Sequence, residues 1–188
     1  MPATLDTPPR WPDVPACHGW LSLDPRGNWR LQDEPISHPG LIAFLNANYT
    51  TDAGGCWLVN NGPQRVYVRL GSAPWVLRLQ PDGSFVTHTG RSVALRGPIW
   101  LDGDSRVFMD TDAGPAALDD RDLAMLFAEV CNASGDLANE ADLSALMQSE
   151  PGTHLHWHGT QVMMLGNEAP AERLGFNPDP KPEDTPLA

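Results

Sequence analysis

The middle of the chain reads nearly the same way twice, and this repetition constrains the fold more than any other feature. Residues 21–29, Leu-Ser-Leu-Asp-Pro-Arg-Gly-Asn-Trp, are echoed by residues 77–85, Leu-Arg-Leu-Gln-Pro-Asp-Gly-Ser-Phe. Both segments fit the frame Leu-x-Leu-x-Pro-x-Gly-x-aromatic. Alternating apolar residues indicate a strand, and the proline and glycine that follow indicate a turn. The sequence therefore predicts an internal repeat of β structure.

Three shorter echoes follow in the same order along the chain: residues 57–58 with 100–101, 65–68 with 106–109, and 73–77 with 114–118. The first copy has 14 extra residues within 36–57, relative to residues 93–100 of the second copy. These extra residues contain a helix expected over 38–49, with Ser37 as its cap and Pro39 in its first turn.

The patterns predict an α+β fold with two related antiparallel β units, two to three helices and a C-terminal hairpin. Further helices are expected over 119–131 and 137–149, the second with Leu143, Leu146 and Met147 as its apolar residues. We divide the chain into five segments: a Pro-rich N-terminal arm at 1–17, a first α+β unit at 18–76, a second unit with acidic helices at 77–150, a His-rich hairpin at 151–165, and a mobile, Pro-rich and acidic tail at 166–188.

Charge is distributed unevenly over the 188 residues, whose net charge is −12. Residues 1–109 hold nine acids and nine arginines, whereas residues 110–188 hold fifteen acids and three basic residues. An acidic protein repels phosphate backbones, so we expect no nucleic-acid partner. No apolar run is long enough to span a membrane, and residues 1–17 lack the apolar core of a signal peptide. With no disulfide pattern among three cysteines, we expect a cytoplasmic protein.

A first candidate site is an arginine-rich strand face. Arg65 and Arg69 flank Tyr67 on one side of an alternating strand, and Trp75 follows close by in the sequence. Guanidinium groups bind carboxylates and phosphates through paired hydrogen bonds, and an aromatic ring can stack on a ligand. These four residues are predicted to bind a small anionic or aromatic ligand. The alternative is that the arginines pair with the protein's own carboxylates or with solvent.

A second candidate site is the His-rich hairpin. His154, His156 and His158 alternate in sequence, which would place three imidazoles on one face of a strand. Imidazole is a common ligand of zinc and copper, so these residues are predicted to bind Zn or Cu. The alternative is an exposed polar face of an edge hairpin, with Leu155 and Trp157 towards the core.

Known catalytic motifs are missing from the sequence. It has no nucleophile elbow, no phosphate-binding loop, no dinucleotide fingerprint and no His-Glu-x-x-His zinc motif. The sequence therefore favours a protein that is not an enzyme.

Several short motifs resemble a proteobacterial domain-of-unknown-function family of about this length. They are His-Gly-Trp-Leu at 18–21, Ile-Ser-His-Pro-Gly-Leu at 36–41 and Gly-Pro-Gln-Arg-Val-Tyr-Val at 62–68. The pattern is also distantly similar to a larger family of the same kind, over residues 18–80 and more loosely 81–131. The resemblance implies a cytoplasmic α+β protein with repeated motifs and a role in small-molecule sensing. His38 stands where the larger family has arginine, so no shared anion site carries over.

Three hypotheses about function remain at this stage. The favoured one is a non-enzymatic regulatory protein with a ligand pocket between the two units. The second is a metalloprotein, with hydrolase activity as one option, centred on the three histidines. The third is an acidic adaptor that binds a basic protein through residues 110–150.

Overall fold

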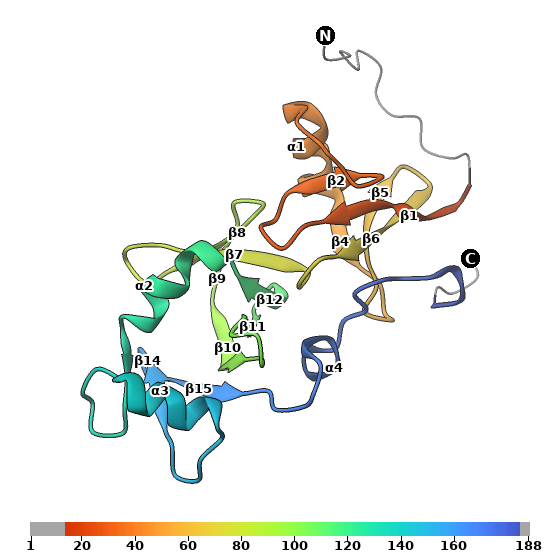
Figure 1. The fold of residues 1–188 in the computed structure, drawn as a ribbon. Coiled ribbons are helices and arrows are strands. Elements are labelled where there is room, and N and C mark those ends of the chain that lie inside the picture. Colours follow the sequence, from red (N-terminus) through yellow and green to blue (C-terminus); the bar gives the residue numbers. More distant parts are fainter. Residues whose placement is uncertain (1–13, 185–188) are drawn as a thin grey trace.

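A computed structural model describes residues 14–184 and shows two β-sheets accompanied by four α-helices over that range (Figure 1). The α+β class is therefore confirmed, with strands as the larger part. The first sheet and most of the second lie on opposite sides of the molecule (Figure 1). The expected N-terminal arm falls largely outside the described residues, which enter the first sheet at Ala16.

The first sheet has six strands in the order β3-β2-β1-β6-β5-β4 over the described residues. Its strands are β1 (Ala16–Leu23), β2 (Trp29–Leu31), β3 (Glu34–Pro35), β4 (Tyr49–Thr51), β5 (Trp57–Asn61) and β6 (Gln64–Leu70). Strand β6 shows why these residues form strands. Its valines and its final leucine face the main core, whereas Arg65, Tyr67 and Arg69 point to the other face, as the period of two predicts.

The second sheet has nine strands in the order β13-β14-β15-β10-β11-β12-β7-β8-β9 over the described residues. Its strands are β7 (Trp75–Leu79), β8 (Phe85–Thr87), β9 (Ser92–Val93), β10 (Leu95–Leu101), β11 (Val107–Thr111), β12 (Gly114–Leu118), β13 (Val130–Cys131), β14 (Leu155–Trp157) and β15 (Thr160–Met164). Strands β14 and β15 pair antiparallel around His158 and Gly159, and β15 joins β10 in parallel.

Neither sheet is purely antiparallel, which corrects the sequence-based expectation. Strand β1 runs parallel to β6, and β7 runs parallel to β12. These parallel pairs join strands that are far apart in sequence, so local turn signals could not predict them. The two sheets share one topology over six strands. In the first sheet β1, β2 and β3 pair in sequence, β4, β5 and β6 follow, and β6 pairs with β1. In the second sheet β7 to β12 are arranged in the same way, and β12 pairs with β7.

The echoed sequence segments differ in how they map onto the two sheets. Residues 21–29 and 77–85 occupy the β1–β2 and β7–β8 hairpins, which hold matching places in the two strand orders. Residues 65–68 lie in β6, but their echo lies in β11 rather than in β12, which holds the matching place. Residues 73–77 and 114–118 are direct neighbours, because β7 pairs with β12.

The helices are shorter than the sequence patterns predict. They are α1 (Pro39–Asn48), α2 (Leu123–Phe127), α3 (Glu140–Met147) and α4 (Pro170–Leu174), with single 3₁₀ turns η1 (Asp120–Asp122) and η2 (Pro182–Asp184). His38, not Ser37, caps α1, because its Nδ1 accepts a hydrogen bond from the Leu41 amide at 3.1 Å. None of the helices in residues 14–184 is long and apolar enough to cross a membrane.

Aromatic side chains join the two sheets into one continuous core. Tyr49 of the first sheet lies between Trp57 and Trp75, with ring centroids 4.9 Å and 5.2 Å away. Trp75 belongs to the second sheet, and its ring also contacts His88, 5.6 Å away. These rings are buried together with aliphatic residues from both sheets, so the tryptophans contribute mainly to the core.

Arginine–aspartate pairs surround the turn η1 near this junction. Arg26, in the β1–β2 turn of the first sheet, forms two hydrogen bonds to Asp120, at 3.0 Å and 2.9 Å. Arg78 of β7 forms two hydrogen bonds to Asp122, whose side chain is only 4% exposed. Asp119 pairs with Arg121, which lowers the pKa of the Asp119 carboxyl to about 2. Of these pairs, Arg26–Asp120 joins the first sheet to η1, whereas the other two fix η1 against β7 and within its own turn.

Residues 175–184, which we name the C-terminal strap, return from α4 to the first sheet (Figure 1). The Asn177 amide donates to the Gly55 carbonyl at 2.9 Å, and the Leu70 amide donates to the Pro178 carbonyl at 2.7 Å. Phe176 is buried in the main core. Composition predicts a mobile tail here, but in the structure this segment packs across the first sheet.

Candidate functional site

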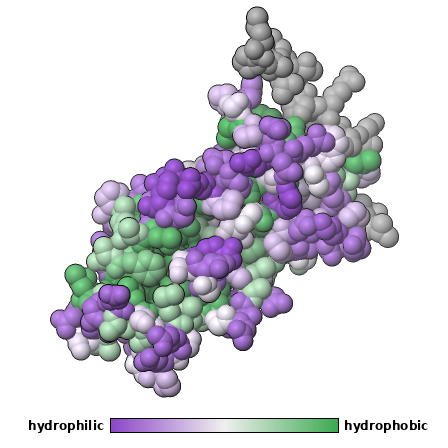
Figure 2. Space-filling view, in the orientation of Figure 1, coloured by the Kyte–Doolittle hydropathy of each residue, from purple (hydrophilic) through white to green (hydrophobic). Residues whose placement is uncertain are grey.

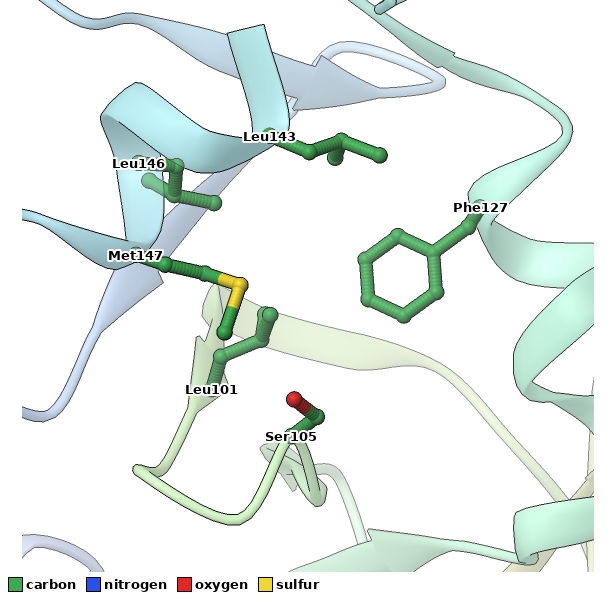
Figure 3. Close-up of a pocket in the computed structure, with 6 residues that line it drawn as sticks. All are labelled: Leu101, Ser105, Phe127, Leu143, Leu146 and Met147. Carbon is green, nitrogen blue, oxygen red and sulfur yellow. The ribbon is translucent and has the colours of Figure 1, made fainter. Parts of the chain in front are cut away.

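An open apolar hollow lies between α2, α3 and the end of β10 (Figure 3). Its volume is about 160 Å³, and its lining residues are Leu101, Ser105, Phe127, Leu143, Leu146 and Met147. We name this hollow the helix pocket. Figure 3 shows the three α3 side chains on one side of the space and the Phe127 ring on the other. A single hydroxyl, that of Ser105, is the only side-chain polar group among these six residues.

The helix pocket follows from the amphipathic pattern of α3. Leu143, Leu146 and Met147 are three and four residues apart, so they lie on one face of the helix. Asn139 starts the helix by accepting hydrogen bonds from the Ala141 and Asp142 amides, and Asp142 completes the capping box. The deepest side chains, Leu146 and Leu101, are 5% and 3% exposed. Buried apolar side chains therefore form the inner wall of the pocket.

Several large apolar side chains in and near α2 and α3 are exposed to solvent. Among the described residues, five large hydrophobic side chains are exposed, and three of them lie within residues 125–147. These are Met125 at 38%, Leu137 at 66% and Met147 at 53% exposure. Figure 2 shows hydrophobic residues gathered on the same face, over α2, α3 and β10. Of the three, Met147 lines the pocket and places exposed apolar surface at its rim. Exposed apolar patches mark binding sites, and flexible methionines adapt to different partners.

The chain around the helix pocket is strongly acidic. From residue 122 to residue 172 there are eight acidic residues and no lysine or arginine. Glu140 lies one turn before Leu143 on α3, and Asp104, with its side chain 81% exposed, directly precedes Ser105. Arg106, which directly follows Ser105, pairs with both Asp102 at 2.7 Å and Asp104 at 3.4 Å, so one base faces two acids here. The rim therefore carries excess negative charge.

The arginine-rich face of β6 is occupied by the protein's own groups. Arg69 forms an ion pair with Asp33, and the Tyr67 hydroxyl donates to Asp52 at 3.5 Å. The Tyr67 ring is 2% exposed and stacks on His18, with centroids 4.5 Å apart. Burial raises the pKa of Tyr67. The structure brings Arg65, Tyr67 and Arg69 onto one face, but Tyr67 offers a ligand almost no free surface.

Trp75 does not join these three residues. It lies in the second sheet, is 7% exposed, and donates its indole N–H to the Ala113 carbonyl at 2.8 Å. Tyr67 belongs to a separate small cluster with Cys56 and Leu58. The four residues predicted to bind a ligand are thus split between the outer face of one sheet and the core between both sheets.

The outer face of the first sheet also contains a cysteine next to polar side chains. Cys56 is 1% exposed, and the side-chain amide nitrogen of Asn177, in the C-terminal strap, donates a hydrogen bond to its sulfur at 3.6 Å. Burial raises the pKa of the Cys56 thiol, and the nearby Asp52 carboxylate raises it further. A thiol held in its protonated form and covered by the strap is a poor nucleophile. This cluster therefore does not have the chemistry of a cysteine enzyme.

The three histidines of the β14–β15 hairpin differ in their surroundings. His154 is exposed before β14, and His156 is half-buried within it. His158 lies in the turn and its Nε2 contacts Glu129 at 2.9 Å. Residues 14–184 contain no group of three or more His, Cys, Asp or Glu side chains arranged to hold a metal ion. Zinc or copper binding at this hairpin stays a prediction, without support from this geometry.

The sequence pattern indicated part of the helix pocket but not the pocket itself. It identified Leu143, Leu146 and Met147 as the apolar residues of α3, yet such a stripe usually packs fully against a core. Leu101, Ser105 and Phe127 come from a strand, a turn and another helix, so only the folded chain brings them together.

The fold is that of an α+β protein with two β-sheets, and an apolar hollow lies between its helices α2 and α3 and the end of β10. The sequence matches family DUF2944, described as "Protein of unknown function (DUF2946)", over residues 4–181. The chain belongs to this family, as the resemblance implied in general terms. No curated protein matches the chain.

Two solved structures are similar to this chain. One is a DUF1285 family protein from Silicibacter pomeroyi DSS-3, with 16% identity, a TM-score of 0.52 and coverage of 79% of this chain and 80% of that chain. The other is a DUF1285 family protein from Shewanella baltica OS155, with 15% identity, a TM-score of 0.37 and coverage of 55% of this chain and 86% of that chain. At 16% identity, the first likeness shows a shared fold alone.

Proposed function

We propose that this protein is a non-enzymatic binding module whose site is the helix pocket, which receives an apolar group of a ligand. The observation that carries this proposal is the open hollow of about 160 Å³, whose apolar lining includes the 53% exposed side chain of Met147. Exposed apolar surface costs free energy in water, and covering it with an apolar group recovers about 25 cal/mol per Å². A mostly apolar cavity with one hydroxyl is suited to binding rather than to catalysis.

The two sheets serve as the scaffold in this proposal. We propose that they are two copies of one β unit, because their strand orders correspond over six strands each. The helix pocket is then built on the second unit alone, from α2, α3 and β10, rather than between the two units. A cytoplasmic location fits the three free cysteines.

An NMR titration with small apolar probes tests the proposal. Indole and hexanol are added separately to the ¹⁵N-labelled protein, and amide shifts are followed. We expect saturable shifts at Leu101, Ser105 and Leu146, which line the pocket. Met147→Trp fills the hollow from its exposed rim and should abolish these shifts.

Phe44→Trp is the matched control for this titration. Phe44 is 37% exposed on α1, so it is also a partly exposed apolar residue of a helix, but it lies in the first unit. We expect Phe44→Trp to bind both probes as the wild type does. Shifts that stay linear in probe concentration, or that persist unchanged in Met147→Trp, would contradict the proposed function.

A further inference from the structure

The helix pocket combines an apolar hollow with an acidic rim, and together they define the chemistry of a partner. An apolar hollow alone would accept any apolar group of suitable size. Glu140 lies one turn before Leu143 on α3, and residues 122–172 contain no lysine or arginine. Asp104 directly precedes Ser105 and shares Arg106 with Asp102, so this end of the rim holds two acids and one base. A ligand that fills the hollow must therefore tolerate, or use, a negative surface around it.

The size of the hollow favours a side chain over a larger molecule. A volume of about 160 Å³ is well below the roughly 300–1,000 Å³ of pockets that enclose drug-sized ligands. The exposed side chain of Met147 extends the apolar surface from the hollow to the solvent, and Figure 2 shows further hydrophobic residues on the same face. Such a surface fits one anchoring apolar side chain together with the apolar stripe that flanks it.

We propose that the helix pocket docks a basic amphipathic helix of a partner protein, whose apolar face enters the hollow and whose lysines and arginines meet the acidic rim. This inference rests on the proposed function of the same site. It commits to a protein segment and not to a membrane, because an acidic rim repels anionic lipid surfaces. A basic helix with apolar residues at spacings of three and four matches both the charge and the shape of this surface.

The rim and the hollow contribute differently to binding, and this difference can be measured. Charge pairs on an exposed rim act over about 10 Å at 0.1 M salt and weaken as salt rises, whereas apolar contacts in the hollow do not. Removing rim charge should therefore weaken binding mainly at low salt. Filling the hollow should weaken binding at every salt concentration.

Fluorescence anisotropy with three labelled 18-residue peptides tests the proposal. The first is a helix with leucines on one face and lysines on the other, the second replaces the lysines with glutamates, and the third scrambles the first. We expect the first peptide to bind at least tenfold more tightly than the other two. Its Kd should rise at least tenfold between 50 mM and 500 mM salt.

Variants of the full chain assign that binding to the pocket. Met147→Trp should abolish it. Glu140 starts α3 and the exposed Glu150 follows its end, so Glu140→Gln with Glu150→Gln should weaken binding at least threefold at 50 mM salt. The control Glu34→Gln with Glu183→Gln removes the same charge from exposed sites on the first sheet and the strap, and should bind as wild type does. An unchanged Kd of the first peptide for Met147→Trp would overturn the inference. Equal Kd values of all three peptides for the wild type would overturn it as well.

Two further results separate this inference from the proposed function. If indole changes the NMR shifts of the pocket amides but no peptide binds, the proposed function stands and the inference of a basic helix as the partner is wrong. If neither indole nor hexanol binds, the proposed function fails by itself. Stronger binding of the wild type to vesicles containing phosphatidylserine than to the first peptide would also overturn the inference, since it would identify a membrane as the partner.

Discussion

Gly27 of the first sheet lies directly against His88 of the second sheet. A Cβ atom placed on Gly27 would stand 2.4 Å from the His88 Cβ and 3.3 Å from the Val76 Cβ. Gly27 also has a φ of 79°, a left-handed conformation that other residues adopt only at a cost. The glycine of the repeated frame is therefore required twice, once by the turn and once by the contact between the sheets.

Gly27→Ala is expected to destabilise the protein by about 2–4 kcal/mol, because the left-handed strain and the clash with His88 add together. Gly90→Ala is the matched control. Gly90 has a similar φ of 88°, but no atom lies within 4 Å of its added Cβ, so only the strain of about 1–2 kcal/mol applies. Urea denaturation of both variants measures the difference. Equal losses for the two variants would show that the sheets do not pack tightly at Gly27.

Protonation of His88 is expected to make the fold sensitive to acid. Burial lowers the pKa of His88 from 6.5 to about 4, and its Nε2 atom is buried without a hydrogen-bond partner among the described residues. Because the folded pKa is the lower one, the unfolded chain binds the proton first as pH falls. The stabilisation is complete above pH 6.5 and is lost between pH 6.5 and pH 4, by up to about 3 kcal/mol.

Urea denaturation at pH 4.5, 5.5, 6.5 and 7.5 checks this pH dependence. His88→Gln removes the titrating group, so its free energy of unfolding should fall less than that of the wild type between pH 6.5 and pH 4.5. The quantity compared is this slope, since the substitution also changes packing at every pH. A variant with the same slope as the wild type would mean that His88 does not couple folding to pH.

Local chemistry predicted the elements of the fold better than their assembly. The Asp24-Pro25-Arg26-Gly27 segment indicated a turn, and the structure has one, with the Gly27 amide bonded to the Asp24 carbonyl. The alternation in β6 also predicted its two faces correctly. The parallel pairing of β1 with β6 could not be predicted, because its register depends on packing between residues about 50 positions apart.

The candidate site was harder to predict for a related reason. Arg69 and Tyr67 carry suitable chemistry for an anion site, but Asp33 and Asp52 from other segments already contact them. The stripe on α3 was visible in the sequence, whereas the rest of the pocket lining comes from β10, the turn after it and α2, which only the fold brings to α3. Helix α2 ends at Phe127, four residues before the end expected from periodicity, and Phe127 itself lines the pocket.

Phe176 is expected to anchor the C-terminal strap over Cys56. Its side chain is 7% exposed, so Phe176→Ala should cost about 3 kcal/mol of stability and loosen the strap. The Cys56 thiol, which contacts Asn177 of the strap, should then react faster with Ellman's reagent, by at least fivefold. Cys17, which is 2% exposed in the main core, serves as the internal reference thiol.

Phe44→Ala is the control variant for this labelling experiment. Phe44 is 37% exposed and lies on α1. Its replacement should cost under about 1 kcal/mol and leave the reactivity of Cys56 unchanged. Equal acceleration at Cys17 and Cys56 in Phe176→Ala would indicate global unfolding and not a local release of the strap.

Asp122 and Asp120 make comparable arginine pairs, but they differ in burial and so in expected importance. The Asp122 side chain is 4% exposed and also accepts a hydrogen bond from the Leu79 amide at 3.0 Å, whereas the Asp120 side chain is 59% exposed. Asp122→Asn should cost about 2–3 kcal/mol, because an amide group would face buried donors. Asp120→Asn should cost under about 1 kcal/mol, since water competes for exposed pairs. Urea denaturation at pH 7 measures both, and a larger loss for Asp120→Asn would show that the pair bridging the two sheets matters more than the buried one.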